Sequence, residues 1–534
     1  MCGIIGGVSR QDITALLIEG LKRLEYRGYD SSGLAVLTKN NAFKRVRLVG
    51  KVDRLEKNLT TRKNKIKGNI GIAHTRWATH GEPIEKNAHP HISNNTVSVV
   101  HNGIIENYLE LKDSQLKQGY RFTSDTDTEV IAHAIEFAMQ SSDSFLESAQ
   151  KAITTFDGAY GLGIISPNYP NTIIATRKGS PLVIGIAKNG NYIASDQLAL
   201  LPVTNKFIFL EEGDIAELNI EKVTIYDKDG IEVNRPIKTS KIKEGEVELG
   251  NYKHFMQKEI FEQPQAIRDT LESRITKESV MVSAFGHKAR DIFKNIKQVQ
   301  IVACGTSYNA GLVAKYWLED IAKIPCNVEV ASEYRYRNPI ILNGTLFVTI
   351  SQSGETADTL EALKTAKKIN NKIHTLCICN SAESSITRNS DLTFLTHAGP
   401  EIGVASTKAF TTQLVALALL TCSIGVSKKT INKQKEKLIV EGLKRLPGLI
   451  NETLLQEDLI KKLAVRFKEK NSALFLGRGT MHAIAMEGAL KLKEISYIHA
   501  EAYPAGELKH GPIALIDESM PVIAIAPNDE LLGK

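Results

Sequence analysis

Cys2 is the first residue of this chain whose type and position could do chemistry. Removal of Met1 would leave its thiol beside a free α-amine, so one residue would supply both a nucleophile and its base. The ordinary pKa is about 8 for an α-amine and about 8.5 for a thiol, so a modest shift lets the amine take the thiol proton at neutral pH. Taken alone, the position favours a plain unprocessed terminus, and a nucleophile is the alternative.

A second candidate is the run Ser-Gln-Ser-Gly-Glu-Thr at residues 351–356. It follows an apolar segment and precedes a helical pattern that begins near Ala357. Hydroxyls, an amide and backbone N–H groups that converge at a helix N-terminus form an anion site without lysine. Serines before a helix are more often simple N-caps. The density of donors here favours a phosphate-binding loop.

A third candidate is a set of titratable side chains near the C-terminal end of the sequence. Glu487, Lys491 and Glu494 have spacings of four and three, which put them on one face of a helix. His510 follows, with an intrinsic pKa suited to proton transfer at neutral pH. The pattern is typical of acid–base chemistry or, in the simpler interpretation, of a solvated stripe of ion pairs.

Composition excludes several classes of function. The 67 Lys and Arg residues are nearly balanced by 60 Asp and Glu, and only two Trp occur, so a nucleic-acid surface is not expected. No G-x-x-x-x-G-K-[ST] motif is present, which argues against a P-loop. Residue 351 is serine, so Ser353 is not the centre of a G-x-S-x-G hydrolase motif. Small anionic substrates remain compatible.

The cysteines indicate a reducing compartment. Six are present, at positions 2, 304, 326, 377, 379 and 422, without C-x-x-C spacing. Neither a disulfide scaffold nor a metal site is predicted, and a cytoplasmic protein fits best. Cys377 and Cys379 lie in an apolar run that reads as a buried strand. The apolar run at 414–426 is too short to span a bilayer and predicts a buried helix, so no membrane association is expected.

The elements that must position these residues fall into two parts. Residues 3–218 alternate short apolar runs with glycine and asparagine turns, with helical patterns at 13–25 and 129–139, which is typical of a strand-rich α+β fold. Residues 227–250 are polar and without a clear period. They are predicted to form a surface connection.

The second part has a different pattern. A helix is predicted at 252–271, followed by repeated units of apolar strand, small-residue turn and helix, with strands at 299–303, 346–350 and 473–476. This pattern indicates parallel α/β units. The first and third strands open two related domains. The second of these is short, ending soon after a strand-like run at 521–526, so its sheet should have an unpaired edge.

Five blocks resemble the N-terminal-nucleophile (class II) glutamine amidotransferases. They are residues 2–6, 24–33, 74–81, 101–107 and 124–129. The resemblance implies a four-layer αββα glutaminase in which Cys2 attacks the glutamine amide. The oxyanion that forms needs donors already aimed at it, and the Asn102 side chain with the Gly103 backbone N–H would supply two.

The same resemblance implies how glutamine is held. Arg76 would bind the α-carboxylate with its two parallel N–H donors, and Asp127 would hold the α-ammonium group. Trp77 would close the glutamine pocket, although core packing is at least as good an interpretation. His74, His80, His89 and His101 can each be satisfied structural histidines, and none is assigned a proton-transfer role.

The second part resembles tandem sugar isomerase (SIS) domains through residues 304–307, 351–356 and 401–406. Joined to the glutaminase half, it resembles the glutamine:fructose-6-phosphate aminotransferase (isomerising) family over essentially the whole chain. The implied substrates are glutamine and fructose 6-phosphate, without a cofactor or metal. The residues that would line the sugar-phosphate pocket are Thr306, Ser307, Ser351, Gln352, Ser353, Thr356, Val404 and Ser406.

Three further roles follow from the family resemblance. Glu494 would move a proton between C2 and C1 of the sugar, and Lys491 would assist at the adjacent hydroxyl. His510 would open the sugar ring from a neighbouring subunit, which implies a homodimer. The family's terminal Lys-Ser-Val-Thr-Val-Glu type of tail, whose lysine forms a Schiff base, is not found, and Lys534 is not given that role. The chain is therefore expected to be a fragment of a longer protein or a glutaminase with a damaged synthase half.

The expected organisation is α+β followed by α/β. The boundaries are 1–226 for the glutamine amidotransferase domain, 227–284 for a linker and connecting helix, 285–430 for the first SIS domain and 455–534 for an incomplete second one. Phosphoribosyl and asparagine-forming amidotransferases share the first half, but they need a diphosphate or ATP-pyrophosphatase loop that is not found here. A sugar-phosphate sensor that binds without turnover remains open.

Overall fold

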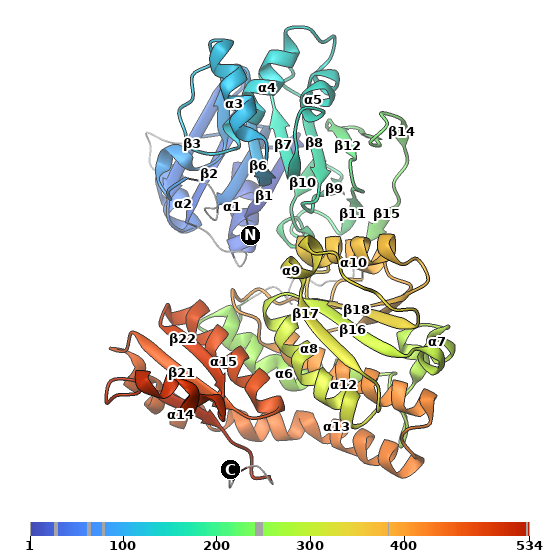
Figure 1. Cartoon of the computed structure of the whole chain (residues 1–534). Coiled ribbons are helices and arrows are strands. Elements are labelled where there is room, and N and C mark those ends of the chain that lie inside the picture. Colours follow the sequence, from blue (N-terminus) through green and yellow to red (C-terminus); the bar gives the residue numbers. More distant parts are fainter. Residues whose placement is uncertain are drawn as a thin grey trace. The chain divides into compact units, whose positions relative to one another are not determined.

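The computed structural model describes residues 2–25, 30–60, 66–76, 81–240, 249–382, 384–529 and 532. The chain divides into two compact units, Met1–Glu248 and Leu249–Lys534 (Figure 1). Each unit has hydrophobic cores of its own.

The described strands of the first unit form two antiparallel sheets. The larger sheet has the order β15 (Ile237–Thr239), β11 (Lys206–Phe209), β9 (Val183–Ala187), β10 (Gly190–Ala194), β1 (Gly3–Ser9), β4 (Ile70–Arg76), β2 (Ser31–Leu37) and β3 (Phe43–Val49). The smaller sheet has the order β14 (Glu232–Val233), β13 (Val223–Tyr226), β12 (Ile215–Leu218), β8 (Ile173–Lys178), β7 (Gly158–Ile165), β6 (Val97–Ile105) and β5 (His91–Ser93).

Helices cover the outer faces of both sheets. They are α1 (Thr14–Leu24), α2 (Val52–Thr60), α3 (Tyr108–Lys117), α4 (Glu129–Met139) and α5 (Phe145–Ile153). One core joins α1 and α2 to the larger sheet, a second lies between the sheets, and a third joins α4 and α5 to the smaller sheet. The predicted four-layer αββα fold is confirmed.

The alternation of side chains along β1 explains why two layers can pack on one strand. Successive residues of a strand point to opposite faces. Ile4 and Val8 accordingly enter the core between the sheets, whereas Ile5 enters the core beneath α1. Both faces of β1 are therefore buried, which is why its sequence is apolar without a polar alternation.

Residues 227–240 differ from the predicted surface connection. They form β14, which pairs with β13, and β15, which pairs with β11, so they extend both sheets of the first unit. These edge strands are short and are held by backbone hydrogen bonds, with half-buried or exposed side chains. Such strands carry no strong apolar period, and the polar composition therefore concealed them.

The larger sheet of the second unit is parallel. Its described strands have the order β17 (Cys326–Val330), β16 (Gln298–Ala303), β18 (Thr345–Ser351), β19 (His374–Cys379) and β20 (Leu392–Leu395). The first strand in sequence, β16, lies between the second and the third. The order of the strands across the sheet therefore reverses between β16 and β18. The loops that follow these two strands lead away from each other.

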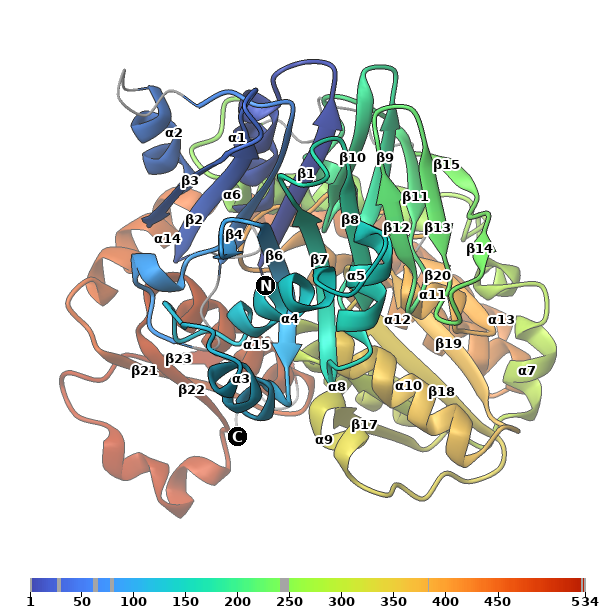
Figure 2. The same ribbon diagram turned by 90° about the horizontal axis from the view of Figure 1, so that it is seen from above.

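Helices cover both faces of this sheet, as Figure 2 shows for α10 against β18. The helices of this part are α6 (Phe255–Leu271), α7 (Ala289–Asn295), α8 (Gly305–Asp320), α9 (Ala331–Tyr336), α10 (Ala357–Ile369), α11 (Ser385–Arg388), α12 (Lys408–Lys428) and α13 (Lys433–Leu454). Cys377 and Cys379 face the α9–α10 side of the sheet, and the predicted buried strand is confirmed.

Helix α12 is longer than the apolar run suggested. It has 21 residues and a mean hydropathy of 1.8 in its most apolar window, enough in length and composition to span a membrane. However, 72% of that window is buried inside the unit, mainly against α6, α7 and α8. It is the central core helix of the second unit, as the prediction of a buried helix required.

The rest of the second unit contains a smaller parallel sheet. Its described strands have the order β22 (His499–Pro504), β21 (Ser472–Gly477) and β23 (Val522–Ile525), and two helices accompany them, α14 (Glu457–Ala464) and α15 (Thr480–Ser496). Helix α15 packs on this sheet and on α8 of the larger part. Since β22 and β23 each pair only with β21 among the described residues, both are edges, as predicted for the shorter repeat.

Candidate functional site

The first candidate site lies where β1 and β6 meet across the two stacked sheets. Cys2 directly precedes β1, and Asn102 lies near the end of β6. The carboxamide nitrogen of Asn102 donates a hydrogen bond to the carbonyl oxygen of Cys2 at 3.1 Å. Asn102 is buried and Cys2 is half-buried. The sheet stacking thus joins two of the predicted site residues, far apart in sequence.

Gly103 adopts a backbone conformation that only glycine tolerates well. Its φ is +136°, and a Cβ atom at this position would lie 1.9 Å from the carbonyl oxygen of Ala159 on β7. Only the absence of a side chain lets β6 and β7 approach each other here. The position beside Asn102 is therefore sterically fixed.

A cluster of buried histidines reaches Asn102 through His74. His74, His89, His91 and His101 are each at most 5% exposed. Burial lowers the pKa of His74 to about 3 and the pKa values of His89 and His91 well below their usual range, because the charged ring would lose its hydration. These three rings are neutral at physiological pH, so they act through hydrogen bonds. His80 lies outside the described residues.

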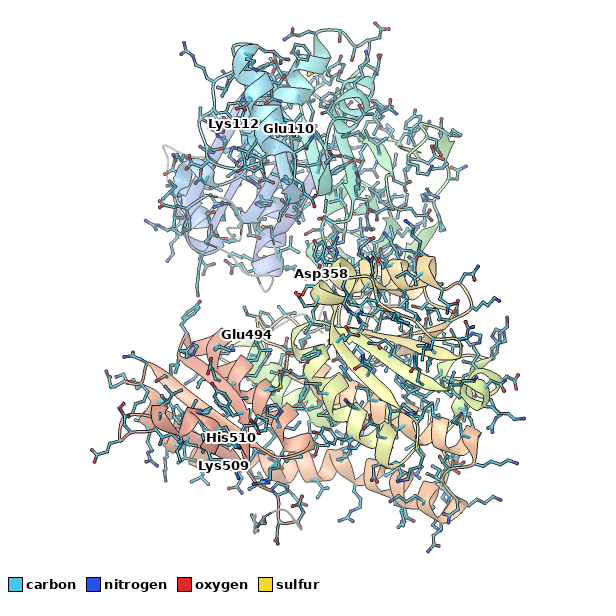
Figure 3. All side chains as sticks on the ribbon, in the orientation of Figure 1. Glu110, Lys112, Asp358, Glu494, Lys509 and His510 are labelled. Carbon is cyan, nitrogen blue, oxygen red and sulfur yellow. The ribbon has the colours of Figure 1, made fainter. Side chains whose placement is uncertain are left out.

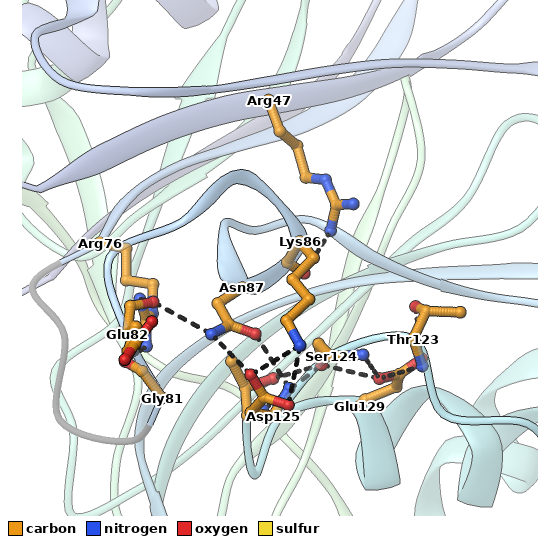
Figure 4. A network of polar contacts seen from close by, with 11 residues as sticks. Arg47, Arg76, Gly81, Glu82, Lys86, Asn87, Thr123, Ser124, Asp125 and Glu129 are labelled. Atoms are coloured by element: carbon orange, nitrogen blue, oxygen red, sulfur yellow. Dashed lines mark hydrogen bonds and ion pairs between the residues drawn. The ribbon is translucent and has the colours of Figure 1, made fainter.

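Arg76 ends β4 and is buried, with 4% of its surface exposed. Its guanidinium donates to the carbonyl oxygens of Gly81 at 3.0 Å and Glu82 at 3.3 Å (Figure 4). It also lies 3.7 Å from the carboxylate of Asp30. A buried guanidinium held by carbonyl groups keeps a fixed orientation. Trp77, the next predicted site residue, lies outside the described residues.

The segment before α4 is organised by Glu129. The carboxylate of this residue accepts hydrogen bonds from the backbone and the hydroxyl of both Thr123 and Ser124, at 2.7–3.1 Å (Figure 4). Asp127 accepts a hydrogen bond from the backbone N–H of Ile105 at 2.9 Å, which ties the segment to β6. Asp127 is thereby placed beside the strand that carries Asn102.

Asn87 connects the segments that carry Arg76 and Asp127. It donates to the carbonyl oxygen of Glu82 at 3.0 Å and accepts from the backbone N–H of Asp125 at 2.9 Å (Figure 4). It is fully buried. No motif spacing in the sequence marks Asn87, because its partners come from two loops that meet only in the folded unit.

The second candidate site lies at the carboxyl ends of β16 and β18. These neighbouring strands are followed by the loops 304–307 and 351–356. In open parallel sheets, ligands bind in the crevice where the loops of two such strands diverge. Thr306 and Ser307 are in the first turn of α8, with Ser307 9% exposed, and Gln352 is half-buried directly after β18.

The hydroxyl groups of loop 351–356 are bonded within the loop itself. Ser351 Oγ accepts from the backbone N–H of Gly354 at 2.9 Å and lies 3.0 Å from the hydroxyl of Thr356. Ser353 Oγ accepts from the backbone N–H of Glu355 at 3.2 Å. Thr356 is the N-cap residue of α10 but makes no side-chain capping bond. The simple N-cap interpretation is therefore wrong for this loop.

The titratable face of α15 packs on the N-terminal half of α8. Glu487 is 5% exposed and accepts hydrogen bonds from Thr306 Oγ1 at 2.9 Å and Asn309 Nδ2 at 2.8 Å. Lys491 Nζ lies 3.3 Å from Glu487 and 2.6 Å from Glu494, and donates to Thr306 Oγ1 at 3.1 Å. The predicted common face is confirmed, and its Glu487 end is buried rather than solvated.

His510 is not part of this network in the described chain. It lies in the short helix Glu507–His510 after β22 and is exposed. Figure 3 shows Glu494 and His510 at separate places on this part of the second unit.

Loop 401–407 is held by a buried acid from α6. Glu259 is 1% exposed, and its carboxylate accepts hydrogen bonds from the backbone N–H groups of Ile402 and of Gly403, the latter at 2.9 and 3.1 Å. Val404 is 61% exposed and Ser406 is half-buried. Val404 therefore follows directly after an anchored turn, and Ser406 lies two residues further on.

The far end of this loop has a similar anchor. Glu401 accepts hydrogen bonds from the backbone N–H groups of Thr407 at 2.8 Å and Ala409 at 3.0 Å. The buried ammonium group of Lys408 pairs with Glu262 of α6 at 2.7 Å. Glu259, Glu401 and Glu262 thus hold the two ends of this loop and the residue that follows it.

Glu259 gives the second unit a predictable pH dependence. Burial raises its pKa from 4.5 to about 7, so the native state keeps a proton that the unfolded chain has already released. Its contribution to stability is complete below pH 4.5 and is lost as the pH rises to about 7, with a slope of at most about 1.4 kcal/mol per pH unit. The amide in Glu259→Gln does not titrate. The unfolding temperature of the variant should therefore rise relative to that of the native protein as the pH increases from 4.5 to about 7.

Thermal unfolding of the native protein and of Glu259→Gln at several pH values checks this expectation. Glu272→Gln, a change of an exposed glutamate just after the same helix, is the control and should follow the native curve. Parallel curves for native protein and Glu259→Gln would contradict the assignment.

Two family models match the chain. The glutamine amidotransferase domain model matches residues 74–202, and the SIS domain model matches residues 292–423 and 466–532.

Two relatives that align with the whole chain carry the same name. The chain is 56% identical over 536 residues to the glutamine–fructose-6-phosphate aminotransferase (isomerizing) of Pseudomonas putida, covering 100% of this chain and 87% of that protein. It is 54% identical over 534 residues to the protein of that name from Haemophilus influenzae, with the same coverage. Among solved structures, it resembles the C-terminal domain of glucosamine-fructose-6-phosphate aminotransferase from Francisella tularensis, at 52% identity and a TM-score of 0.52, over 54% of this chain and 80% of that one.

Proposed function

The chain belongs to the glutamine–fructose-6-phosphate aminotransferase (isomerizing) family, and from this premise we propose which of its residues perform each part of the reaction. The enzyme hydrolyses glutamine and transfers the ammonia to fructose 6-phosphate with isomerisation. The products are glutamate and glucosamine 6-phosphate. The observation that carries the assignment is the presence, in one chain, of a glutaminase unit and a parallel-sheet sugar-phosphate unit.

Cys2 is the nucleophile of the glutaminase step. Its α-amine takes the thiol proton, the thiolate adds to the amide carbon of glutamine, and the carbonyl oxygen becomes an oxyanion. The carboxamide nitrogen of Asn102, already bonded to the backbone of Cys2, donates to this oxyanion together with the Gly103 N–H. As the intermediate collapses, the C–N bond breaks, the α-ammonium group returns its proton to the leaving nitrogen, and ammonia departs from a thioester. Water then adds to the thioester, giving glutamate and the free thiol.

Arg76 and Asp127 hold the amino-acid end of glutamine. This role is supported by the burial of both side chains and by their fixed orientation on segments that Asn87 joins. A bidentate guanidinium suits the α-carboxylate, and a carboxylate suits the α-ammonium group. Trp77 adds to this pocket by resemblance to the family.

The sugar phosphate binds at the carboxyl ends of β16 and β18. The contributing residues are Thr306, Ser307, Ser351, Gln352, Ser353, Thr356, Val404 and Ser406. Glu494 moves the proton between C2 and C1, and Lys491 assists at the adjacent hydroxyl. The 2.6 Å ion pair between these two side chains, next to Thr306, supports their action at one sugar.

His510 opens the sugar ring in the site of a second copy of the chain. Its exposure, outside the α15 network of its own chain, supports this role, and a homodimer follows from it. The cytoplasm is the proposed location. In the described structure, Cys304, Cys326, Cys377 and Cys379 are thiols rather than disulfides, which suits a reducing compartment.

A product assay tests the proposal. The protein is incubated with glutamine and fructose 6-phosphate, and glutamate and glucosamine 6-phosphate are quantified separately. We expect Glu494→Gln to keep glutaminase activity and to lower the formation of aminated sugar by about 10²-fold or more, because a general base is lost. Glu518→Gln, a change of an exposed acid, is the control. Sugar-phosphate binding by the native protein without aminated product would contradict the proposal and favour a sensor.

A further inference from the structure

His74 is a buried side chain that the proposed reaction does not use. It lies on β4, directly opposite Ile4 of β1, and points with it between the two sheets of the first unit. Its side chain is 0% exposed. A polar ring that is buried here must form hydrogen bonds within the protein, because these offset the free energy lost with its hydration.

The contacts of His74 determine which ring nitrogen carries the proton. Nε2 lies 2.9 Å from the backbone carbonyl oxygen of His101 and 3.0 Å from Oδ1 of Asn102. A carbonyl oxygen only accepts hydrogen bonds, so Nε2 must donate. The ring is neutral and has a single proton, and Nδ1 has no hydrogen-bond partner within the described chain. His74 is therefore the Nε2–H tautomer.

This tautomer determines the orientation of the Asn102 carboxamide. With Oδ1 held by His74, Nδ2 faces Cys2 and donates one proton to its carbonyl oxygen at 3.1 Å. The second proton of Nδ2 remains for another acceptor. A flipped carboxamide would set the nitrogen of Asn102 against the Nε2–H of His74 and its oxygen against the carbonyl of Cys2. Both contacts would be repulsive.

His89 is the neighbour that shares this environment. Its ring centroid is 4.1 Å from that of His74, and its Nδ1 lies 3.2 Å from His74 Nε2. Because Nε2 of His74 carries the proton, Nδ1 of His89 must present its lone pair. The proton on Nε2 of His74 and the unprotonated Nδ1 of His89 are therefore consistent with each other. The same proton on His74 determines the orientation of the Asn102 carboxamide.

We propose that His74 is a positioning residue for the glutaminase reaction: it holds the Asn102 carboxamide with its nitrogen toward the carbon that Cys2 attacks. The inference rests on the proposed role of Asn102 as an oxyanion donor. In this proposal His74 acts through Asn102 and not on the substrate.

An aldehyde analogue of glutamine separates this role from a packing role. In γ-glutamyl aldehyde, the thiolate adds to the carbonyl carbon, the C=O π bond breaks, and the oxygen becomes an oxyanion that takes up a proton to give a hemithioacetal. Its inhibition constant therefore depends on the oxyanion donors, whereas the dissociation constant of glutamate depends on the groups that hold the amino-acid end. Both constants are measured for the native protein and for His74→Leu, His74→Gln, Asn102→Ala and the double variant His74→Leu/Asn102→Ala.

We expect His74→Leu to raise the inhibition constant of the aldehyde by about 10²-fold and to lower kcat for glutamine by a similar factor. The dissociation constant of glutamate should stay within about twofold of the native value. His74→Gln can place an amide N–H near the position of Nε2 and should restore most of the loss. In the Asn102→Ala background, the change of His74 should have no further effect, because the residue it positions is gone.

Two results would overturn the inference. One is an additive effect of His74→Leu in the Asn102→Ala background, or an equal loss of aldehyde and glutamate binding, since either shows a general structural role. The other is retained aldehyde affinity in Asn102→Ala, which refutes the proposed oxyanion donor as well. If His74→Leu does not fold, His74→Asn replaces it in the same comparisons, because its shorter amide reaches the position of Nδ1 but not that of Nε2. An additive effect of His74→Asn in the Asn102→Ala background would overturn the inference.

Discussion

Cys2→Ala is expected to lower kcat for glutamine hydrolysis by about 10⁴-fold or more, because the reaction loses its only nucleophile and the remaining groups can merely bind the substrate. Fructose 6-phosphate binding should be unchanged, since the residues proposed for it all lie in the other unit. Ammonia release from glutamine and calorimetric titration with the sugar phosphate measure the two properties on the same sample.

Cys326→Ala is the matched control for this variant. Burial raises the pKa of the Cys326 thiol to about 12, so it stays protonated and unreactive. Its removal should leave glutamine hydrolysis unaffected. Glutaminase activity that survives in Cys2→Ala, or that disappears in Cys326→Ala alone, would contradict the assignment of the nucleophile.

Gly103→Ala is expected to cause the largest loss of stability of any single methyl addition at the glutaminase site. The new Cβ would lie 1.9 Å from the carbonyl oxygen of Ala159, and the φ of +136° is itself unfavourable for alanine. Strain and overpacking together should lower the free energy of unfolding of the first unit by about 3–5 kcal/mol. If β6 shifts to relieve the clash, glutaminase activity is lost as well, because Asn102 moves with it.

Gly119→Ala separates the two causes. Gly119 has a φ of +93°, but a Cβ atom added there would have no neighbouring atom within 4 Å, so this change adds conformational strain without a clash. It should cost only about 1–2 kcal/mol. Thermal unfolding and glutamine turnover of the two variants provide the test, and equal costs for both would show that the approach of β7 does not determine the identity of residue 103.

Periodicity predicted the parts of the fold that bury large apolar faces. The α4 helix has the bounds that its pattern indicated, and the strands β16, β18 and β21 extend the predicted runs by one residue at one or both ends. The edge strands β14 and β15 could not be predicted, because backbone pairing rather than side-chain burial holds them. Patterns of apolar residues report burial, and these strands have little of it.

The candidate sites were only partly accessible from the sequence. The spacing of Glu487, Lys491 and Glu494 was sufficient to place them on one face of a helix. The supporting residues were not predictable in this way. Asn87 and Glu259 act on backbone groups of loops that are far away in sequence, at 38 and more than 140 positions, and no local pattern encodes such partners.

The carboxylate of Glu487 has a consequence for chimeric proteins. This one buried acid, on the shorter SIS repeat, is the acceptor for Thr306 and Asn309 of the longer one. If the two repeats were taken from different relatives, the donors and the acceptor would have to be transplanted together. A hybrid that kept Glu487 but lost either donor would bury a carboxylate with too few hydrogen bonds. The two repeats should therefore be taken from the same relative when a chimera is built.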